Sequence, residues 1–435
     1  MVLRMVDTTL SVPVEMTPVP RPTQVIAAHS LGRRLVIAAA GIALVLKLVI
    51  AWNTMGTNDV VSFYHFGRSL SANGLEATYR HDLAFNHPPL TSDFIRAIYR
   101  ADHLPWMHDY GVAFPFLLRL PGILADFVVV LVLLNMAKPL RIPTGALLLL
   151  ALSPVSLMVS GFHGNTDPVM VMFLVLAAAM CVWERPTLCG LFLALSCQIK
   201  IIPLLLVPVF FFHFLHRRQA ISFTFPFAVA LLISWIEPLL KFPAIFAERV
   251  LCYGGLWGLW GITYWLEVTG IKSFAFADYY QPQAIQKTII ATGLKLAIVA
   301  FVIALAWRRR KLHGRSLFAS LGLTWVIFFI LSPGVGAQYM VWLMPFVLVL
   351  SPVLFVWLTI GSSLFLFFFY NSITGGLPWY VGVSWGKPEV TWLPWSLWPW
   401  FVLLTGAGLL WRMAQREQPG LRFWSLASVS PLPSL

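Results

Sequence analysis

A group of titratable side chains follows directly on the first long apolar segment of the chain, and six of them are considered as candidates for chemistry. They lie within "TMGTNDVVSFYHFGRSLSANGLEATYRHDLAFNHPPLT", residues 54–91, and are Asp59, His65, Arg68, Glu76, Asp82 and His87. This stretch is too polar to cross a membrane. Asp59 emerges just beyond the apolar run, where a lipid-borne phosphate and a polar acceptor could both reach it. A carboxylate there can act as a general base, which must come within about 2.6–3.2 Å of the proton it takes. The alternative role for Asp59 is to N-cap a short surface helix that begins "DVVSFYHFGRSL".

Three further charged residues lie in apolar surroundings. Lys200 follows the short run "LCGLFLALSCQ", and it would either neutralise a phosphate at the rim of a cavity or extend to the membrane interface. Arg119 and Asp126 are separated by seven positions within one apolar run and share a helix face. A charge at mid-membrane costs about 2.5–3.5 kcal/mol on insertion scales. We therefore expect a structural ion pair between these two residues.

The composition decides the class of protein that must position these groups. The 435 residues are 59% hydrophobic and only 11% charged, with a mean hydropathy of +0.80. Ordinary soluble domains are far less apolar. Apolar runs follow one another to the end of the chain, which predicts an all-α polytopic membrane protein built as one bundle.

The net charge of +13 does not indicate nucleic-acid binding. The basic residues gather at the ends of apolar runs, as in the cytoplasmic loops of membrane proteins, and no basic face interleaved with stacking aromatics occurs. These clusters are Arg33-Arg34, Lys138/Arg141, Arg217-Arg218, Arg308 to Arg315 and Arg412/Arg416. The four cysteines lack CxxC spacing, so we expect packed thiols rather than disulfides or a zinc site.

About twelve membrane spans are predicted, since a spanning helix needs roughly 20 apolar residues. They fall near residues 35–52, 113–137, 144–161, 168–183, 188–198, 201–215, 221–239, 287–307, 316–331, 339–350, 353–371 and 395–412. Residues 1–33 are expected to form a disordered cytoplasmic tail, residues 34–413 a single transmembrane domain and residues 414–435 a second cytoplasmic tail.

The expected topology concentrates titratable groups on the outer face of the membrane. With a cytoplasmic N-terminus, the external segments are residues 53–112, 161–168, 240–287, 332–339 and about 372–391, together with the short turn that carries Lys200. Most carboxylates lie in this set, so the predicted active site faces the periplasm, the extracellular space or a lumen.

The order of motifs along the chain resembles that of the GT-C glycosyltransferases. Asp59, "FYHFGRSLSANGLEATY" and "NHPPLT" look like the first external loop of that superfamily. "FHGNTDPVMV", "CQIKIIPLLLVP", "ERVLCYGGLWGLW" and "SPGVGAQYMVWLMPF" are similar to four later segments. The resemblance runs from about Asp59 to Phe346 and is closest to the dolichyl- or polyprenyl-phosphate-sugar-dependent glucosyl- and mannosyltransferases of lipid-linked oligosaccharide assembly. Asn86-His87 replaces the acidic residue that those enzymes tend to carry before Tyr-Pro-Pro.

This resemblance implies a GT-C-like bundle with a helical first external loop and an inverting transfer. A hexose, glucose or mannose, would move from a polyprenyl-phosphate donor to a glycan or glycolipid acceptor, with Asp59 as the general base. We expect fixed cations at the departing phosphate. The remaining roles are expected as follows: Lys200 and Arg249 at the donor phosphate, His163, Asp167 and Gln338 around the donor sugar, and His87 on the acceptor side.

Two other classes of function remain open from the sequence. A lipid-linked glycan ligase or polymerase also works on the outer face, although its catalytic groups are expected in a large late loop. A lipid or sugar transporter would show broken helices in corresponding halves, and no such symmetry occurs. No HxxxH, HExxH or Asp-x-Asp spacing is present, so we expect catalysis without a cofactor, although a divalent metal is not excluded.

Overall fold

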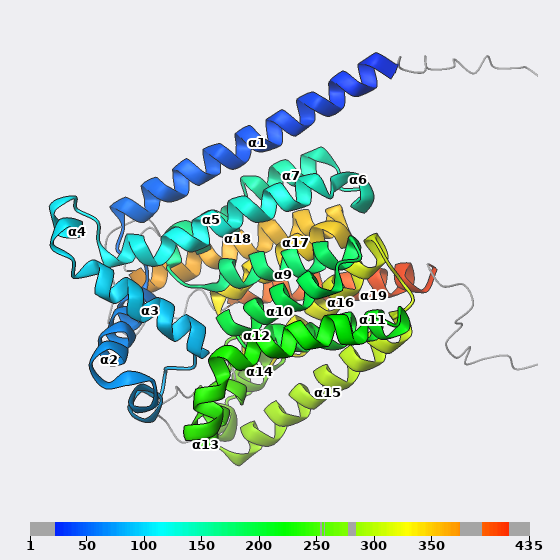
Figure 1. Ribbon diagram of the computed structural model, residues 1–435. Helices are drawn as coiled ribbons and strands as arrows, with labels where there is room; N and C mark the ends of the chain where they lie inside the picture. The colour runs from blue at the N-terminus through cyan, green and yellow to red at the C-terminus, as the bar shows by residue number, and fades with distance from the viewer. Residues whose placement is uncertain (1–21, 253–254, 256, 277–283, 375–393, 417–435) are drawn as a thin grey trace, which may run out of the picture.

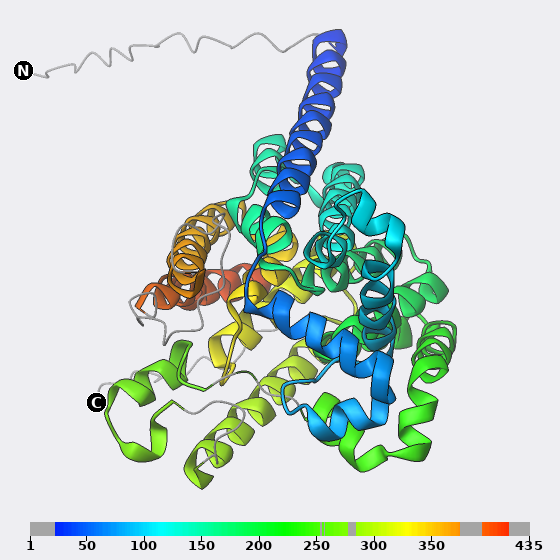
Figure 2. The same cartoon turned by 90° about the vertical axis from the view of Figure 1, so that its left-hand side faces the viewer.

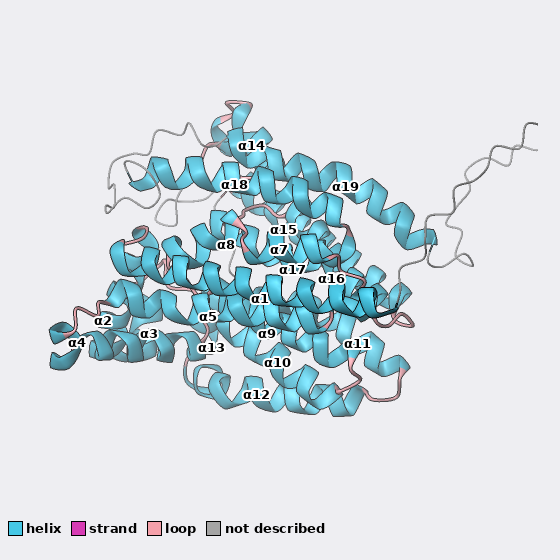
Figure 3. Ribbon diagram, turned by 90° about the horizontal axis from the view of Figure 1, so that it is seen from above, coloured by secondary structure: helices cyan, strands magenta, loops and turns pink. Residues whose placement is uncertain are grey.

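The computed structural model describes residues 22–252, 255, 257–276, 284–374 and 394–416 (Figure 1). Within these ranges the chain forms helices joined by short loops, and it forms no β-strand (Figure 3). The predicted all-α polytopic class is confirmed. The expected external segment near residues 372–391 lies mostly outside the described residues, as do residues 1–21 and 417–435 of the two expected tails.

In the part of the chain that the structure describes, six helical segments are long and apolar enough to cross a membrane. Their membrane-length portions are Ser30–Asn53, Phe114–Asn135, Thr144–His163, Ala220–Lys241, Ile285–Arg309 and Pro352–Thr374. The helices that form them are α1 (Pro22–Asn53), α5 (Phe114–Asn135), α7 (Thr144–Ala151), α8 (Pro154–Ser156), the π-helical η1 (Leu157–His163), α12 (Ala220–Lys241), α15 (Ile285–Arg309) and α18 (Pro352–Thr374). Helix α1 begins at Pro22, inside the segment expected to be a tail.

Shorter apolar helices fill the interior between the long ones. They are α9 (Asp167–Val182), α10 (Pro186–Ile199), η2 (Ile202–Leu206) with α11 (Val207–His216), α16 (Arg315–Leu331) and η5 (Ala337–Tyr339) with α17 (Met340–Leu350), and α19 (Leu397–Arg416) packs on α18. Every residue of α17 is buried, as expected for a helix that is apolar on all sides. The total of twelve spans stays a prediction.

Packing contacts join these helices into one bundle. Helix α10 lies against both α9 and α12, while α5 lies against α1 and α9. On the other side, α16 contacts α15 and α17. Helix α1 follows the outside of the bundle, and Figure 1 shows it projecting beyond the other helices at its N-terminal end.

The helices that do not span the bundle gather mainly at one end. These are α2 (Asn58–His81), α3 (Pro89–Asp102), α4 (Pro105–Asp109), α13 (Pro243–Phe246) with η3 (Ala247–Leu251), and α14 (Gly261–Val268) with η4 (Lys272–Phe274). Figure 2 looks onto this end, with α2 lying across it. The opposite end carries the short α6 (Ala137–Leu140) and the basic turn between α11 and α12 (Figure 1). Basic clusters and catalytic candidates are thus separated along the bundle.

Candidate functional site

The loop between η1 and α9 presents two of the expected site residues, His163 and Asp167. Gly164 turns the chain with a φ of 84°, and a Cβ atom added there would lie 2.4 Å from a methyl group of Val60. A larger residue therefore cannot replace this glycine without strain. The Asn165 side chain accepts a hydrogen bond from the Asp167 backbone N–H at 3.0 Å. The local turn thus holds His163 against Thr57 at the start of α2 and fixes Asp167 through Asn165.

Asp59 lies in the first turn of α2, where the helix dipole favours a negative charge. The expectation that Asp59 is the N-cap is wrong, because Thr57 occupies that position and makes no side-chain capping bond. Instead, Asp59 Oδ2 lies 2.9 Å from His163 Nε2. The Asp59 side chain keeps 34% of its surface exposed, so its carboxylate is fixed on one side and open on the other.

Neighbouring charges outweigh burial in setting the acidity of Asp59. Burial acts to raise its pKa, but His163, Lys200 and His87 act in the opposite direction and hold the pKa below its usual value. The carboxylate is therefore ionised over the whole physiological range, as a general base must be at the start of a reaction.

Lys200 forms the second charged pair of the site. Its Nζ atom lies 2.6 Å from Oδ1 of Asp167, a residue with no exposed surface. The ammonium also lies over the rings of Tyr339, at 4.4 Å, and Trp342, at 5.2 Å, both favourable positions for a cation. Lys200 does not extend to the interface as a helix-end lysine would. Its ammonium is instead largely shielded from solvent and lies beside the Asp167 carboxylate.

His87 joins the same cluster from the loop before α3. Its ring packs against Phe63 at 4.8 Å and Phe85 at 5.7 Å between centroids. Burial first, and then the charge of Lys200, lower the pKa of His87 to about 3, against an opposing effect of Asp59. The imidazole is therefore neutral, and its Nδ1 atom has no hydrogen-bond partner among the described residues.

Arg249 and Gln338 are not members of the two charged pairs. Arg249 Nε donates to the carbonyl of Tyr79 at 3.1 Å, and its guanidinium lies 3.5 Å from Glu248. Its contacts thus run to α2 and to its own segment. Gln338 is half-buried and precedes Tyr339. The structure therefore brings Asp59, His87, His163, Asp167 and Lys200 together and leaves the phosphate role of Arg249 and the sugar role of Gln338 as predictions.

Tyr370, near the C-terminal end of α18, was not predicted from the sequence as a site residue. Its ring packs on His163 at 5.3 Å and on Phe162 at 5.6 Å between centroids. The run "FLFFFYN" around it is indistinguishable from an ordinary lipid-facing stretch, so only the tertiary packing reveals this neighbour of the site.

Arg119 braces the ends of α1 and η1, and η1 carries His163. Its guanidinium donates to the carbonyls of Ala51 and Thr54 at the end of α1 and to those of Gly161 and Phe162 at the end of η1. The last carbonyls of a helix lack intrahelical partners, and a cation is favoured beside them. Arg119 therefore fixes the segment that presents His163.

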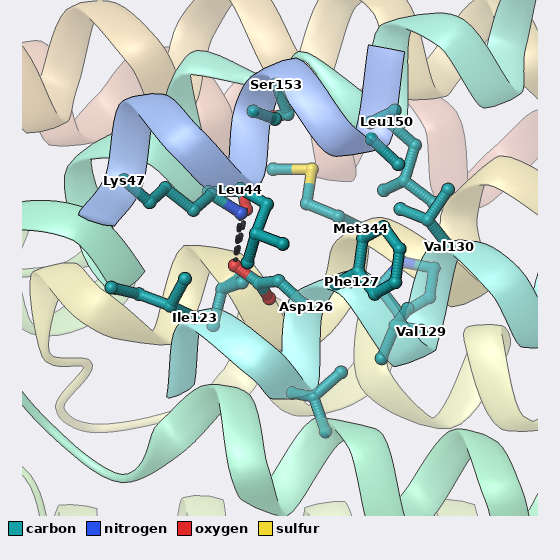
Figure 4. A pocket seen from close by; sticks show the side chains of 17 residues that line it. Leu44, Lys47, Ile123, Asp126, Phe127, Val129, Val130, Leu150, Ser153 and Met344 are labelled. Carbon is teal, nitrogen blue, oxygen red and sulfur yellow. Dashed lines mark hydrogen bonds and ion pairs between the residues drawn. The ribbon is translucent and has the colours of Figure 1, made fainter. Parts of the chain in front are cut away.

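The predicted ion pair between Arg119 and Asp126 is wrong. Asp126 binds Lys47 of α1 instead, at 2.7 Å (Figure 4). It also accepts hydrogen bonds from Ser156 at 2.5 Å and from Ser160. A cavity of about 30 Å³ lies beside this buried cluster, enough for a water molecule. The cluster joins α1, α5 and the segment that leads to His163.

An apolar cavity of about 350 Å³ adjoins the lysine side of the site, between η2, α11, α15 and α16. Its lining includes Ile201, Ile202, Val302, Phe328 and Tyr339. The Tyr339 ring that holds Lys200 thus also borders the cavity, whose lining further includes Lys295. Within the described ranges, no three His, Cys, Asp or Glu side chains are grouped as ligands of one metal ion, and metal independence stays a prediction.

A comparison with known protein families identifies the family of this chain. No curated protein matched the sequence. A family model described as glycosyltransferase family 87 matches residues 103–333, which include His163, Asp167, Lys200 and Arg249. This match covers more than half of the chain, and it supports the GT-C resemblance noted from the sequence. The protein therefore belongs to glycosyltransferase family 87, a family of GT-C-type membrane glycosyltransferases.

Proposed function

We propose that this glycosyltransferase moves a hexose, glucose or mannose, from a polyprenyl-phosphate donor to a glycan or glycolipid acceptor, with inversion at the anomeric carbon. The proposal rests on a cluster of two charged pairs, Asp59–His163 and Asp167–Lys200. The pairs are held together because His163 and Asp167 flank the same short loop. The cluster supplies a base and a cation at one end of a membrane bundle. The basic clusters at the other end favour an outward-facing site.

Asp59 is the proposed base for the acceptor hydroxyl. The hydroxyl oxygen attacks the anomeric carbon as its proton passes to the Asp59 carboxylate, the bond from that carbon to the phosphate oxygen breaks, and polyprenyl phosphate leaves with the bonding electrons. His163 positions the carboxylate at 2.9 Å, while the open side of Asp59 faces the acceptor. The low pKa of Asp59 keeps it in the proton-accepting form.

Lys200 is the proposed partner of the departing phosphate. An ammonium has three donors, and one of them is directed at Asp167 at 2.6 Å, which leaves two for phosphate oxygens. Negative charge grows on the phosphate as the bond breaks, and a fixed cation in a water-poor site stabilises it most at that point. The adjoining 350 Å³ cavity is suited to the first part of the polyprenyl chain.

The decisive experiment measures sugar transfer by the purified protein from short-chain polyprenyl-phosphate glucose and mannose to acceptors in a membrane extract. Asp59→Asn is expected to lower kcat by about 10²–10⁴-fold, the usual contribution of a general base. Lys200→Ala is expected to lower kcat by about 10²-fold or more with either donor.

Matched variants separate these effects from general loss of charge. Glu76→Gln removes a carboxylate of the same helix that pairs with Arg80 on the surface, and Lys241→Ala removes an exposed lysine paired with Glu237. Both controls are expected to keep wild-type activity. Full activity in Asp59→Asn would rule out this base, and no transfer from any polyprenyl-phosphate sugar would rule out the donor class.

A further inference from the structure

Tyr370 presents a polar atom that the described protein groups do not satisfy. The residue has no exposed surface, and its hydroxyl has no hydrogen-bond partner among the described residues. A buried hydroxyl without a partner costs about 1–3 kcal/mol, so such groups in folded proteins call for an explanation, such as a bound ligand. The hydroxyl therefore marks a place where a hydrogen bond is missing.

The surroundings of this hydroxyl indicate where that missing bond would form. The Tyr370 ring is fixed against His163 and Phe162, and the same His163 ring bonds Asp59 at 2.9 Å. The phenol thus adjoins the residue that positions the proposed base, and Asp167, which holds Lys200, lies four positions beyond that histidine. Any sugar that links an acceptor at Asp59 to a phosphate at Lys200 must occupy the space between these two pairs.

We propose that the Tyr370 hydroxyl donates a hydrogen bond to one hydroxyl group of the donor's sugar ring and so contributes to the choice of sugar. This inference rests on the proposed function. A neutral phenol is better matched to a neutral sugar hydroxyl than to a phosphate, whose charge is matched by Lys200. Tyr370 is then a specificity-determining residue contributed by α18, whereas the two charged pairs come from α2, the η1–α9 loop and the end of α10.

The test removes the phenolic oxygen from the protein and, separately, one hydroxyl oxygen at a time from the donor sugar. Tyr370→Phe keeps the ring that packs on His163 and removes only the hydroxyl. It is expected to lower kcat/KM about tenfold with the parent polyprenyl-phosphate sugar, the effect of one hydrogen bond. Among the 2-, 3-, 4- and 6-deoxy donors, one should show a kcat/KM about tenfold below that of the parent donor with the wild-type protein. With Tyr370→Phe, that deoxy donor and the parent donor should have the same kcat/KM.

Thermal unfolding of the same samples separates this role from a structural one. Tyr370→Phe is expected to unfold at the wild-type temperature or above it, because no described group loses a partner. Tyr79→Phe is the matched control, since the Tyr79 hydroxyl donates to the His87 carbonyl at 2.6 Å, and it should unfold at a lower temperature.

The outcomes distinguish the inference from the function on which it rests. If the wild type transfers sugar but Tyr370→Phe loses the same factor with every deoxy donor, or loses nothing, the sugar contact is refuted and the proposed function stands. A lower unfolding temperature in Tyr370→Phe assigns the residue a structural role and also refutes the inference. If the wild type transfers sugar from no polyprenyl-phosphate donor, the proposed function and the inference fail together.

Discussion

Replacement of Arg119 by methionine should destabilise the protein far more than loss of a surface arginine. The guanidinium is 1% exposed and donates to four backbone carbonyls from the ends of two helices, those of Ala51, Thr54, Gly161 and Phe162. Methionine has a similar length but no donor. All four acceptors would therefore lose the donor that the guanidinium provides, and two helix ends would no longer be joined.

The size of the effect follows from the number of acceptors left without a partner. Each buried carbonyl that loses its donor costs about 1–3 kcal/mol. If water reaches two of the four, the remaining two still cost about 2–6 kcal/mol, and we expect a loss of about 4 kcal/mol for Arg119→Met. Arg119→Lys keeps the charge but replaces the planar fork by a compact ammonium, so we expect about half of this loss.

Chemical unfolding of the purified protein in mixed micelles measures this loss as a shift of the midpoint. Arg96→Met is the matched control, because Arg96 pairs with Asp93 on the surface of α3 with 38% of its side chain exposed. Exposed pairs of this kind contribute only about 0–1 kcal/mol. A midpoint for Arg119→Met that equals the midpoint for Arg96→Met would refute the bracing role.

Two further predictions concern pH and orientation. The His87 pKa of about 3 lies below its value in the unfolded chain, so the unfolded state takes up a proton first as the pH falls. The stability contributed by neutral His87 is then lost below about pH 6.5, and the loss reaches about 2 kcal/mol at pH 5. Unfolding midpoints measured at pH 7.5 and pH 5 should show this loss in the wild type and in His103→Gln, which changes an exposed histidine. The loss should be absent in His87→Phe. In a Cys252→Ser background, a cysteine replacing Asn73 should react with an impermeant thiol reagent on intact cells and one replacing Arg218 only after permeabilisation, and the reverse pattern would show that the site faces the cytoplasm.

The bounds of the helices followed closely from the sequence. The segment expected near residues 113–137 is the helix Phe114–Asn135, and the one expected near 168–183 is Asp167–Val182. Lipid requires every backbone polar group to be satisfied within the segment, so a bounded apolar run of the right length has few alternatives to a helix. The local pattern therefore sufficed for these elements.

The partners of the buried charges did not follow from the sequence. Arg119 and Asp126 share a helix face, but seven residues separate them by about 10.5 Å along the axis, too far for a direct contact. The true partner of Asp126 is Lys47, 79 positions away on another helix. Ser156 and Ser160, four positions apart in an apolar run, were the available signal that a polar group would face them.

The residues of the candidate site could be proposed from the sequence, but the contacts between them could not. Asp59, His163, Asp167 and Lys200 were all expected on the outer face. The resemblance to GT-C enzymes was the reason for assigning them to one site. Their pairing depends on the π-helical turn of η1, which no periodicity in the sequence indicated. Tyr370 escaped notice for a simpler reason, since an aromatic residue in an apolar run is usually a packing residue.

The pair of Lys47 and Asp126 also bears on how the chain enters its membrane during synthesis. Lys47 is synthesised 79 residues before its partner, so α1 enters the membrane with an uncompensated lysine, at a cost below the value of about 2.5–3.5 kcal/mol for a charge at the helix centre. The strongly apolar residues around it permit this entry. The penalty is relieved only when α5 arrives beside α1. The polar contacts of the first helix are thus completed by a later one, and a ribosome that stalls before Asp126 would leave Lys47 in the bilayer without its carboxylate partner.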